Sequence, residues 1–350
     1  MKILFLGETY RADAITWMNG LKEFGGFEII TWELKTPSNG LKNRCLRLWE
    51  YILCFPRVRK LIKIHKPDMI IAERTTSYGF LAALSGVKPM AVAQQGITDL
   101  WPGNSIMLPL KKALQHYAFK KATLIHAWGP AMTVSMNAAN VDMAKVMVLP
   151  KGIDLKTFTK GNNADNGKIH AVVTRSLMPE YRHDIILKAF DILNQKGIDF
   201  TLTIVGGGTQ LDNLQALAKT LHIDSKVNFT GRIANTQLPG ILQQSNFYIS
   251  MPTTEGVSSS LFEAMATHCY PIVTDIPGNR SWIRHRENGQ LVTVDDFSSL
   301  ADEIIWAHEN AAYRNQAVLN NREFVEDHAD YNANMKNIAA RYHELINKTN

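Results

Sequence analysis

The sequence predicts an α/β protein made of two doubly wound, Rossmann-like domains. The chain has 350 residues, which is more than one hydrophobic core usually supports. Short apolar runs alternate with helical patterns along most of the chain, and this alternation is typical of a parallel sheet covered by helices on both faces. The alternation stops at GNNADNG (161–167) and then restarts. We therefore expect domains at 1–160 and 161–327, followed by a last segment at 328–350.

The elements of the first domain follow from that alternation. Strands are expected at 2–6, 27–32, 68–72, 89–93, 123–127 and 145–150, and helices at 12–24, within 42–66, and at 78–84, 108–121 and 131–139. The segment that ends this domain is rich in Gly, Asn and Asp, which favour turns. The sequence therefore predicts one complete parallel sheet before the break.

The second domain repeats the pattern. Strands are expected at 170–174, 200–205, 227–229, 247–250 and 271–273, and helices at 184–196, 211–221, 238–244 and 261–267. Beyond residue 297 nearly all of the pattern is helical. In the last segment the apolar residues Met335, Ile338, Tyr342 and Ile346 are spaced by 3, 4 and 4, so they form one face of a helix that must pack against another element.

Composition excludes several classes of protein. With 45% hydrophobic and 20% charged residues, the chain can bury sizeable cores and is neither disordered nor fibrous. Its three cysteines have no CxxC spacing, which argues against a disulfide framework or a cysteine-built zinc site. No apolar run reaches the roughly 18 residues of a membrane span, and the opening KILFL is too short for a signal peptide. We expect a cytoplasmic protein.

The positive charge belongs to the first half of the chain. Residues 1–160 contain 22 Lys and Arg against 11 Asp and Glu, whereas residues 161–350 contain 16 against 21. Many of these cations lie at helical spacing between Lys42 and Lys66. Two interpretations stay open: attraction to an anionic membrane surface or substrate, or an ordinary amphipathic helix pair with solvated cations. No aromatic-interleaved motif indicates nucleic-acid binding.

The stretch SMPTTEGVSSSLFEAMA carries the most chemical information. FYIS (247–250) is a predicted buried strand, so PTTEGV follows its carboxyl end, where open α/β sheets bind their ligands. Ser258, Ser259 and Ser260 then begin a helix, whose free N–H groups suit a phosphate.

Two glutamates flank that helix start. Glu255 and Glu263 have seven residues between them, which places them about 10 Å apart on one side by helix rise. Such a pair suits the hydroxyl groups of an elongated polar ligand. The alternative for Glu263 is structural, because Ser260-Leu-Phe-Glu263 also fits a capping box.

The E-x7-E pattern in EGVSSSLFEAMA resembles glycosyltransferase family 4, the retaining enzymes with the GT-B fold. Further stretches resemble the family in the same order: LPKGIDLKTF (149–158), TRSLMPEYRHDIILKAF (174–190), IVGGG (204–208), FTGRI (229–233) and PIVTDIPGNRSWIRHRENGQLV (271–292). The resemblance implies a two-domain GT-B protein with a cleft between the domains, and a last helix that packs back on the first domain.

The resemblance also implies roles for individual residues. Glu263 would bind the donor ribose, and Glu255 would bind the transferred sugar. Arg175 matches an arginine that neutralises the leaving diphosphate, where a fixed cation stabilises developing charge. The donor-binding set would further include Ser259, Ser260, Gly256, Val257 and Ile233.

Three further positions match the family pattern less closely. The family usually has a lysine where Glu180 stands, so Arg182 is expected to act as the second donor-binding cation. Gly7 matches a glycine loop near the reaction centre, although a plain turn glycine is the alternative. Gln95 replaces a common histidine, and Asp99 is expected near the transferred sugar or acceptor, either as a catalytic residue or as a polar contact.

The resemblance implies a retaining glycosyltransferase that moves a sugar from a nucleotide diphosphate donor to a glycan or lipid-linked acceptor. No D-x-D occurs in the sequence, so we expect no metal and no cofactor beyond the nucleotide-sugar. Leu211 stands where a G-x-G-x-x-G motif would need glycine, which disfavours a dehydrogenase. A sugar-nucleotide epimerase on the same fold and an inactive sugar-nucleotide-binding partner protein are the alternatives.

Overall fold

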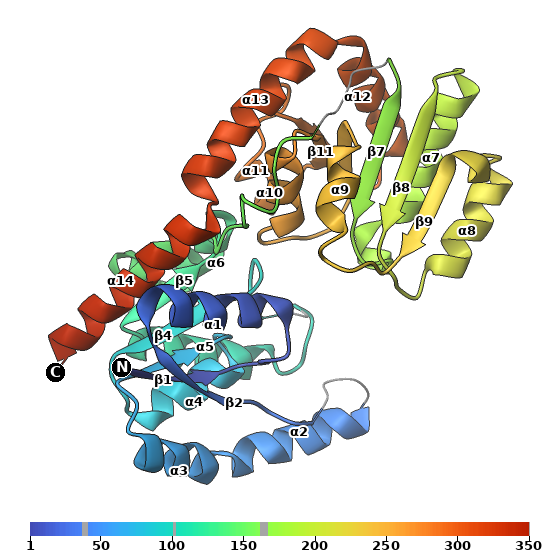
Figure 1. Cartoon of the computed structure of the whole chain (residues 1–350). Helices are drawn as coiled ribbons and strands as arrows, with labels where there is room; N and C mark the ends of the chain where they lie inside the picture. The colour runs from blue at the N-terminus through green and yellow to red at the C-terminus, as the bar shows by residue number, and fades with distance from the viewer. Residues whose placement is uncertain (37–40, 101–102, 162–166, 350) are drawn as a thin grey trace. The chain divides into compact units, whose positions relative to one another are not determined.

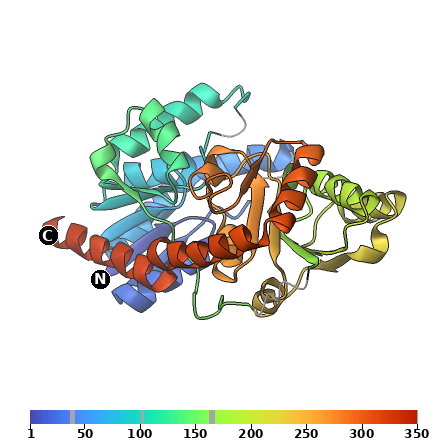
Figure 2. The ribbon, with the colours of Figure 1, turned by 90° about the horizontal axis from the view of Figure 1, so that it is seen from above.

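The computed structural model of the chain describes residues 1–36, 41–100, 103–161 and 167–349, and it forms two compact units (Figure 1). Unit 1 comprises Met1–Lys151 together with Tyr331–Asn350, and unit 2 comprises Gly152–Asp330. The first unit thus ends after Lys151 rather than after residue 160. The chain returns to it at Tyr331, so both termini lie on unit 1 (Figure 2).

Unit 1 is built on a six-stranded parallel sheet in the order β2-β1-β3-β4-β5-β6. The strands are β1 (Lys2–Leu6), β2 (Glu28–Trp32), β3 (Met69–Ala72), β4 (Met90–Gln94), β5 (Leu124–Ala127) and β6 (Val146–Val148). The helices are α1 (Ala12–Gly25), α2 (Leu41–Leu53), α3 (Phe55–His65), α4 (Ser77–Ser85), α5 (Leu108–Lys121) and α6 (Ala131–Ala138). The order changes direction between β1 and β3.

The carboxyl-terminal helix α14 (Tyr331–Thr349) packs on unit 1. Its buried face includes the regularly spaced Met335, Ile338, Tyr342 and Ile346. The Tyr342 hydroxyl lies 2.6 Å from Nε2 of the buried His126 on β5. Gly20 of α1 allows close approach, because a Cβ at this position would lie 2.6 Å from Met335. The apolar stripe in the sequence is therefore the face by which α14 covers the unit.

Unit 2 has a second six-stranded parallel sheet in the order β12-β11-β10-β7-β8-β9. The strands are β7 (Ile169–Thr174), β8 (Phe200–Val205), β9 (Val227–Gly231), β10 (Phe247–Ser250), β11 (Tyr270–Thr274) and β12 (Gln290–Val292). The helices are α7 (His183–Gln195), α8 (Leu211–Thr220), α9 (Leu238–Gln243), α10 (Ser259–Ala266), α11 (Pro277–Arg280), α12 (Phe297–Glu309) and α13 (Ala311–His328).

Apolar side chains fill both sides of the unit 2 sheet. One cluster contains Phe190 and Phe200 and reaches α12, and the other contains Phe262 and Met265 of α10. Covering both faces of a parallel sheet produces the doubly wound architecture that the sequence predicts. The fold class is confirmed. In the described part of the chain no helix combines the length and the apolar character that crossing a membrane requires.

Candidate active site

The candidate site lies where the strand order of unit 2 changes direction. The chain forms β8 and β9 on one side of β7 and then places β10 on the other side. Open α/β sheets bind ligands at the carboxyl ends of the strands at such a point. Arg175 directly follows β7, and Glu255 lies in the loop between β10 and α10.

Arg175 connects the two loops. Its guanidinium donates hydrogen bonds to the Glu255 carboxylate and to the Ser258 hydroxyl, and its Nε lies 3.4 Å from the Ser250 hydroxyl. Burial by itself lowers the pKa of Arg175, but the neighbouring Tyr248 and Glu255 raise it well above its ordinary value. The structure therefore holds a permanent cation at the end of β7, beside a carboxylate.

Helix α10 begins two residues earlier than an N-cap at Ser260 would require. Ser258 is the N-cap residue, and its hydroxyl accepts the backbone N–H of Leu261 at 3.2 Å. The capping box between Ser260 and Glu263 is therefore not formed. Ser259 and Ser260 occupy the first helical positions, whose backbone N–H groups have no acceptor within the helix.

Glu263 points a second carboxyl group at this region. Burial raises its pKa to about 7, and the charge of Arg175 opposes that shift. No other residue in the described ranges hydrogen-bonds this carboxyl group, although the residue is largely shielded from water. The group is available to accept hydrogen bonds from the hydroxyls of a ligand.

Two glycines allow the backbone around the site to pack closely. A Cβ on Gly278 of α11 would lie 2.1 Å from the carbonyl oxygen of Glu255, and a Cβ on Gly206 would lie 2.3 Å from that of Arg175. Neither glycine was among the predicted site residues. Both lie in stretches that carry the family resemblance, IVGGG and the segment 271–292, which was the available signal.

Arg182, the expected second donor-binding cation, is paired with two aspartates of unit 2. Its Nε and one terminal nitrogen each lie 3.1 Å from an oxygen of Asp184, and it also donates to Asp295. These bonds, first those to Asp184, raise its pKa above the ordinary value. The structure therefore commits the expected second cation to two carboxylates.

The remaining predicted donor-binding residues surround α10 and β9. Ser259 is exposed, and the Ser260 hydroxyl lies 3.5 Å from the carbonyl of Thr174. Gly256 is buried, while the partly buried Val257 and Ile233 pack against the apolar cluster of α10. Ile233 follows β9, so its backbone lies at the same edge of the sheet as Arg175.

In unit 1, Gly7 also lies at a change of strand direction, between β1 and β3. A Cβ on Gly7 would lie 2.6 Å from the Glu73 carboxyl group, whose Oε2 accepts the backbone N–H of Glu8 at 2.6 Å. Burial raises the pKa of Glu73 to about 7, assisted by the charge of Asp13. Sequence reasoning missed Glu8 and Glu73: the available signal for Glu8 was its position directly after Gly7, whereas no motif includes Glu73.

Asp99 holds two loops of unit 1 together. One carboxylate oxygen accepts the backbone N–H and the hydroxyl of Thr75, each at 2.7 Å, and the other accepts the Gln95 N–H at 3.2 Å. Burial raises its pKa, whereas these hydrogen bonds oppose the shift. The geometry favours a positioning role for Asp99.

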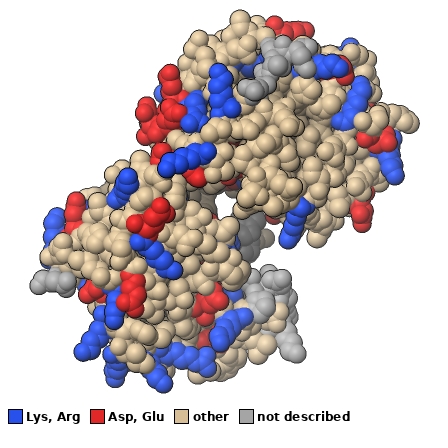
Figure 3. All heavy atoms as spheres, viewed as in Figure 1, with Lys and Arg blue, Asp and Glu red and all other residues tan. Residues whose placement is uncertain are grey.

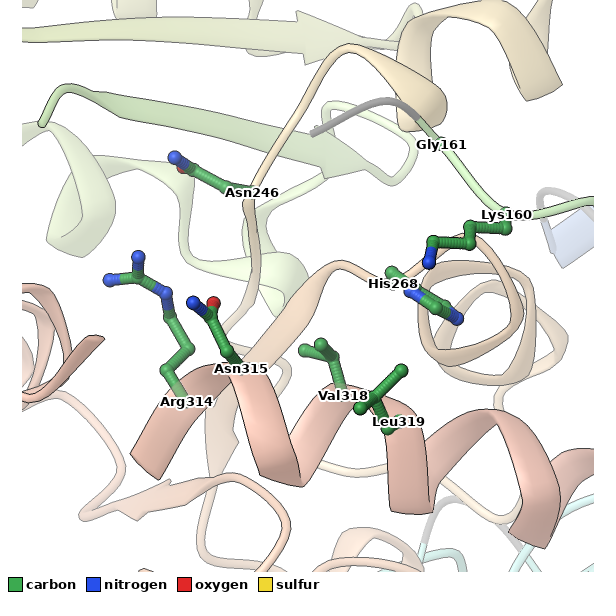
Figure 4. A pocket seen from close by; sticks show the side chains of 8 residues that line it. All are labelled: Lys160, Gly161, Asn246, His268, Arg314, Asn315, Val318 and Leu319. Atoms are coloured by element: carbon green, nitrogen blue, oxygen red, sulfur yellow. The ribbon is translucent and has the colours of Figure 1, made fainter. Parts of the chain in front are cut away.

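A pocket of about 270 Å³ lies at the opposite edge of the unit 2 sheet (Figure 4). Its lining includes Lys160, His268, Asn246 and Arg314. Asn246 precedes β10, whereas Ser250 ends it, so this pocket is separated from Arg175 by the length of the strand. Arg314 donates to the carbonyl of Ala307 at 2.9 Å and caps α12. The pocket is therefore distinct from the candidate site.

The arrangement around Arg175 suits an anionic ligand that carries hydroxyl groups. It offers one fixed cation, the free N–H groups of a helix start and two carboxyl groups, which together match phosphate and sugar. Among the described side chains, no group of three or more His, Cys, Asp or Glu residues is arranged to hold a metal ion.

Two family models match the chain. The model described as "Glycosyl transferases group 1" matches residues 155–324, and the model described as "Glycosyl transferase 4-like" matches residues 2–127. The first therefore covers most of unit 2 and the second most of unit 1. Between them they leave unmatched the segment 128–154, which contains α6 and β6, and the segment 325–350, which contains the end of α13 and α14.

Curated relatives are also glycosyltransferases. An uncharacterized glycosyltransferase of Haemophilus influenzae is 37% identical over 119 residues, which is about a third (33%) of either chain. The Escherichia coli UDP-Gal:alpha-D-GlcNAc-diphosphoundecaprenol alpha-1,3-galactosyltransferase is 24% identical over 70% of this chain and 67% of its own.

Solved structures share the fold at low sequence identity. Anabaena Alr3699/HepE, in a complex with UDP, superposes with a TM-score of 0.81 at 16% identity, over 99% of this chain and 100% of that one. Sucrose-phosphate synthase from Thermosynechococcus elongatus gives a TM-score of 0.83 at 14% identity, over 99% and 100%. These likenesses show the fold, which is GT-B. The two family models, which match residues 2–127 and 155–324, show that the chain belongs to the family 4, or group 1, glycosyltransferases.

Proposed function

We propose that this protein transfers a sugar from a nucleoside diphosphate to a hydroxyl group of an acceptor, and that unit 2 binds the donor. The observation that carries this proposal is the position of Arg175, which joins Glu255 and the N-cap residue of α10, Ser258, where the strand order changes direction. Glu263 adds a carboxyl group with no partner in the described residues. The HepE structures include complexes with UDP and with UDP-glucose, and this supports the assignment by analogy.

Each group has a role in the proposed reaction. Arg175 and the N–H groups of Ser259 and Ser260 bind the diphosphate, while Glu263 accepts hydrogen bonds from the ribose and Glu255 from the transferred sugar. Negative charge develops on the diphosphate as the glycosidic bond breaks, so a cation fixed at that point stabilises the transition state more than the ground state.

The proposed transfer retains the configuration of the anomeric carbon. The acceptor oxygen bonds to this carbon on the face that the diphosphate leaves, and the electron pair of the broken bond departs with the diphosphate. An oxygen of the departing phosphate takes the proton of the acceptor hydroxyl. This route needs no metal and no protein base, in keeping with the lack of D-x-D in the sequence.

Turnover with a panel of nucleotide-sugars tests the function. Release of nucleoside diphosphate should rise when a suitable glycan or lipid-linked acceptor is added. Glu255→Gln should abolish this release with the fold intact, whereas Glu287→Gln, a charge removal at an exposed position of the same unit, should have no effect. Binding of the donor without acceptor-dependent release would instead favour an inactive sugar-nucleotide-binding protein.

We further propose that helices α2 and α3 contact an anionic membrane surface. Four apolar side chains of α2 are 49% to 63% exposed: Leu46, Trp49, Ile52 and Leu53. Exposed cations follow on α3, namely Arg57, Arg59, Lys60 and Lys63, and Lys and Arg gather along this edge of unit 1 (Figure 3). Apolar side chains beside cations match the interface of an anionic bilayer. The relative from Escherichia coli acts on a diphosphoundecaprenol-linked substrate by its name.

Co-sedimentation with vesicles tests that contact. Wild-type protein should bind vesicles that contain phosphatidylglycerol, with less binding at high salt and little to neutral vesicles. Trp49→Ser with Leu53→Ser should weaken binding, whereas Val134→Ser, which changes another exposed apolar residue of unit 1, should not. Equal binding to neutral and anionic vesicles would contradict the proposal.

A further inference from the structure

Three arginines surround one buried carboxylate where unit 1 changes strand direction. Glu8 follows β1, and its carboxylate is 7% exposed. Arg74 follows β3, Arg47 comes from α2, and Arg11 precedes α1. None of these four residues belongs to the proposed donor site.

The contacts are close and asymmetric. Arg47 and Arg74 each donate to a different oxygen of Glu8, at 3.0 Å and 2.7 Å, and Arg11 lies 3.6 Å from the second oxygen. The side chains of Arg11 and Arg74 are 45% and 35% exposed. The cluster is therefore open to solvent on the side of these two arginines, while Glu8 is closed off behind them.

Positive charge exceeds negative charge in this cluster. Arg11 is also paired with Asp13 at 3.2 Å, so three guanidinium groups face two carboxylates. Lys151 lies beside the cluster, with its Nζ 3.2 Å from the carbonyl of Asp13, and burial lowers the pKa of this lysine. The adjoining Glu73 contributes only part of a negative charge near neutral pH, because burial raises its pKa to about 7.

Donor groups also remain unused. Nε of Arg74 is buried and has no hydrogen-bond partner among the described residues. Each guanidinium has five N–H donors in a planar fork that matches phosphate oxygens. Excess charge and uncommitted donors at a ligand-binding edge of the sheet together indicate an anion site.

We propose that Arg11, Arg47 and Arg74 bind a phosphate group of the acceptor, which rests on the proposed transfer function. The anion approaches the exposed faces of Arg11 and Arg74, while Glu8 holds the guanidinium groups in place from behind. A phosphate dianion satisfies the cluster better than a carboxylate does, because it offers three oxygens and a second negative charge. The acceptor class is thus a phosphate-bearing glycan or lipid rather than a neutral sugar.

The probe is inorganic phosphate, measured by calorimetry on the full chain with Arg175→Gln as the background. That substitution disables the cation of unit 2, so the remaining binding reports on unit 1. Arg11→Gln or Arg74→Gln should weaken phosphate binding about tenfold, the size of one charge-assisted hydrogen bond. Arg341→Gln, which removes an arginine of α14 whose side chain is 39% exposed, is the matched control in unit 1 and should leave binding unchanged.

Glu8→Gln gives a result of opposite sign. It removes the internal competitor while the arginines stay, so phosphate should bind more tightly, about tenfold. A merely structural ion cluster predicts no gain in phosphate affinity from this change. Arg11→Gln leaves Glu8 paired with Arg47 and Arg74, so it keeps the test valid if Arg74→Gln fails to fold.

The outcomes separate the inference from the function on which it rests. Equal phosphate binding by the background, Arg11→Gln and Glu8→Gln proteins would overturn the site, even if sugar transfer is observed. Phosphate binding that depends on these residues, in a protein that transfers no sugar from any donor, would support the site and reject the transfer function. Vesicles with phosphatidic acid, run beside free phosphate, show whether the group belongs to a lipid or to a soluble acceptor.

Discussion

The two units have the same kind of sheet, yet they equip the same topological position differently. In unit 2 the change of direction between β7 and β10 carries one arginine, Arg175, with two glutamates and a helix start. In unit 1 the corresponding change between β1 and β3 carries three arginines around the single carboxylate of Glu8. The first arrangement suits a diphosphate bonded to two sugars, and the second suits a bare anionic group.

Each position also contains a carboxyl group with a pKa near 7, and here the units differ again. Glu73 in unit 1 accepts the Glu8 backbone N–H at 2.6 Å and holds the turn at Gly7. Glu263 in unit 2 has no such partner among the described residues. The difference indicates that Glu73 is a positioning residue, whereas Glu263 is kept for a ligand.

The largest expected effect comes from removing the cation of unit 2. Arg175→Gln should lower kcat by about 10²- to 10³-fold, because charge on the leaving diphosphate loses its fixed counterion. Arg284→Gln, at an 81% exposed position of the same unit, is the control in steady-state assays with a saturating donor. Wild-type kcat in both variants would contradict the proposal that Arg175 of unit 2 stabilises the leaving diphosphate.

The next largest effect on kcat is expected from the close packing of Gly278 against the backbone of Glu255. Gly278→Ala places a methyl group 2.1 Å from the Glu255 carbonyl oxygen, so the loop must shift, and a displacement of this kind lowers kcat by about 10²-fold. Gly240→Ala is the matched control, because nothing lies within 4 Å of a Cβ there. Similar activity in the two alanine variants would show that the loop tolerates displacement.

The pH dependence of stability distinguishes Glu263 and Glu73, whose pKa values are raised, from carboxyl groups with ordinary pKa values. The folded-state pKa of Glu263 is raised from 4.5 to about 7, so the folded protein holds a proton that the unfolded chain has released. Stability should therefore fall as the pH rises from about 4.5 to 7 and level off above 7. Glu263→Gln should remove part of that fall, worth about 2 to 3 kcal/mol at pH 8.

Denaturant unfolding at pH 4.5 and pH 8 measures this difference. The pKa of Glu73 is raised in the same direction and to the same value, so Glu73→Gln should remove a second part of the fall in stability. The effect should be smaller than that of Glu263→Gln, because this variant also loses the hydrogen bond to the Glu8 backbone N–H. An unchanged pH profile in Glu263→Gln would mean that this group is ionised throughout.

The smallest expected effect is confined to unit 1. Tyr342→Phe removes the 2.6 Å hydrogen bond to His126 and should cost about 1 to 2 kcal/mol of stability, with donor binding unchanged. Thermal melts with and without a nucleoside diphosphate separate the two effects. A loss of donor affinity in this variant would show that α14 influences the site of unit 2.

In the candidate site of unit 2 only the part around α10 is local in the sequence, whereas Arg175 lies 80 residues from Glu255 and was predicted from the family resemblance. A strand, a loop with Glu255 and a helix with Glu263 follow one another within EGVSSSLFE and its flanks, so periodicity and spacing fix their relation. The alternative of a capping box from Ser260 to Glu263 is wrong, since both Ser258 and Ser260 are suitable N-cap residues and only the backbone geometry selects Ser258.

The site of unit 1 could not be read in this way. Glu8 and Glu73 are 65 residues apart, and their contact exists because β3 pairs with β1 rather than with β2. The partners of Arg182 show the same limit, since Asp295 lies 113 residues further along the chain. Strand order, which sequence patterns do not specify, assembles both contacts.

Equilibrium binding of nucleoside diphosphates to Glu263→Gln and Glu73→Gln shows directly whether unit 2 binds the donor, since these variants make the same chemical change in the two units. Calorimetry with UDP and GDP identifies the nucleotide that binds wild-type protein more tightly. Glu263→Gln should weaken the binding of that nucleotide about 10- to 100-fold, as expected for lost hydrogen bonds to a partly ionised carboxyl group, while Glu73→Gln should leave it unchanged. Weaker binding by Glu73→Gln, with wild-type affinity in Glu263→Gln, would contradict the assignment of the donor to unit 2.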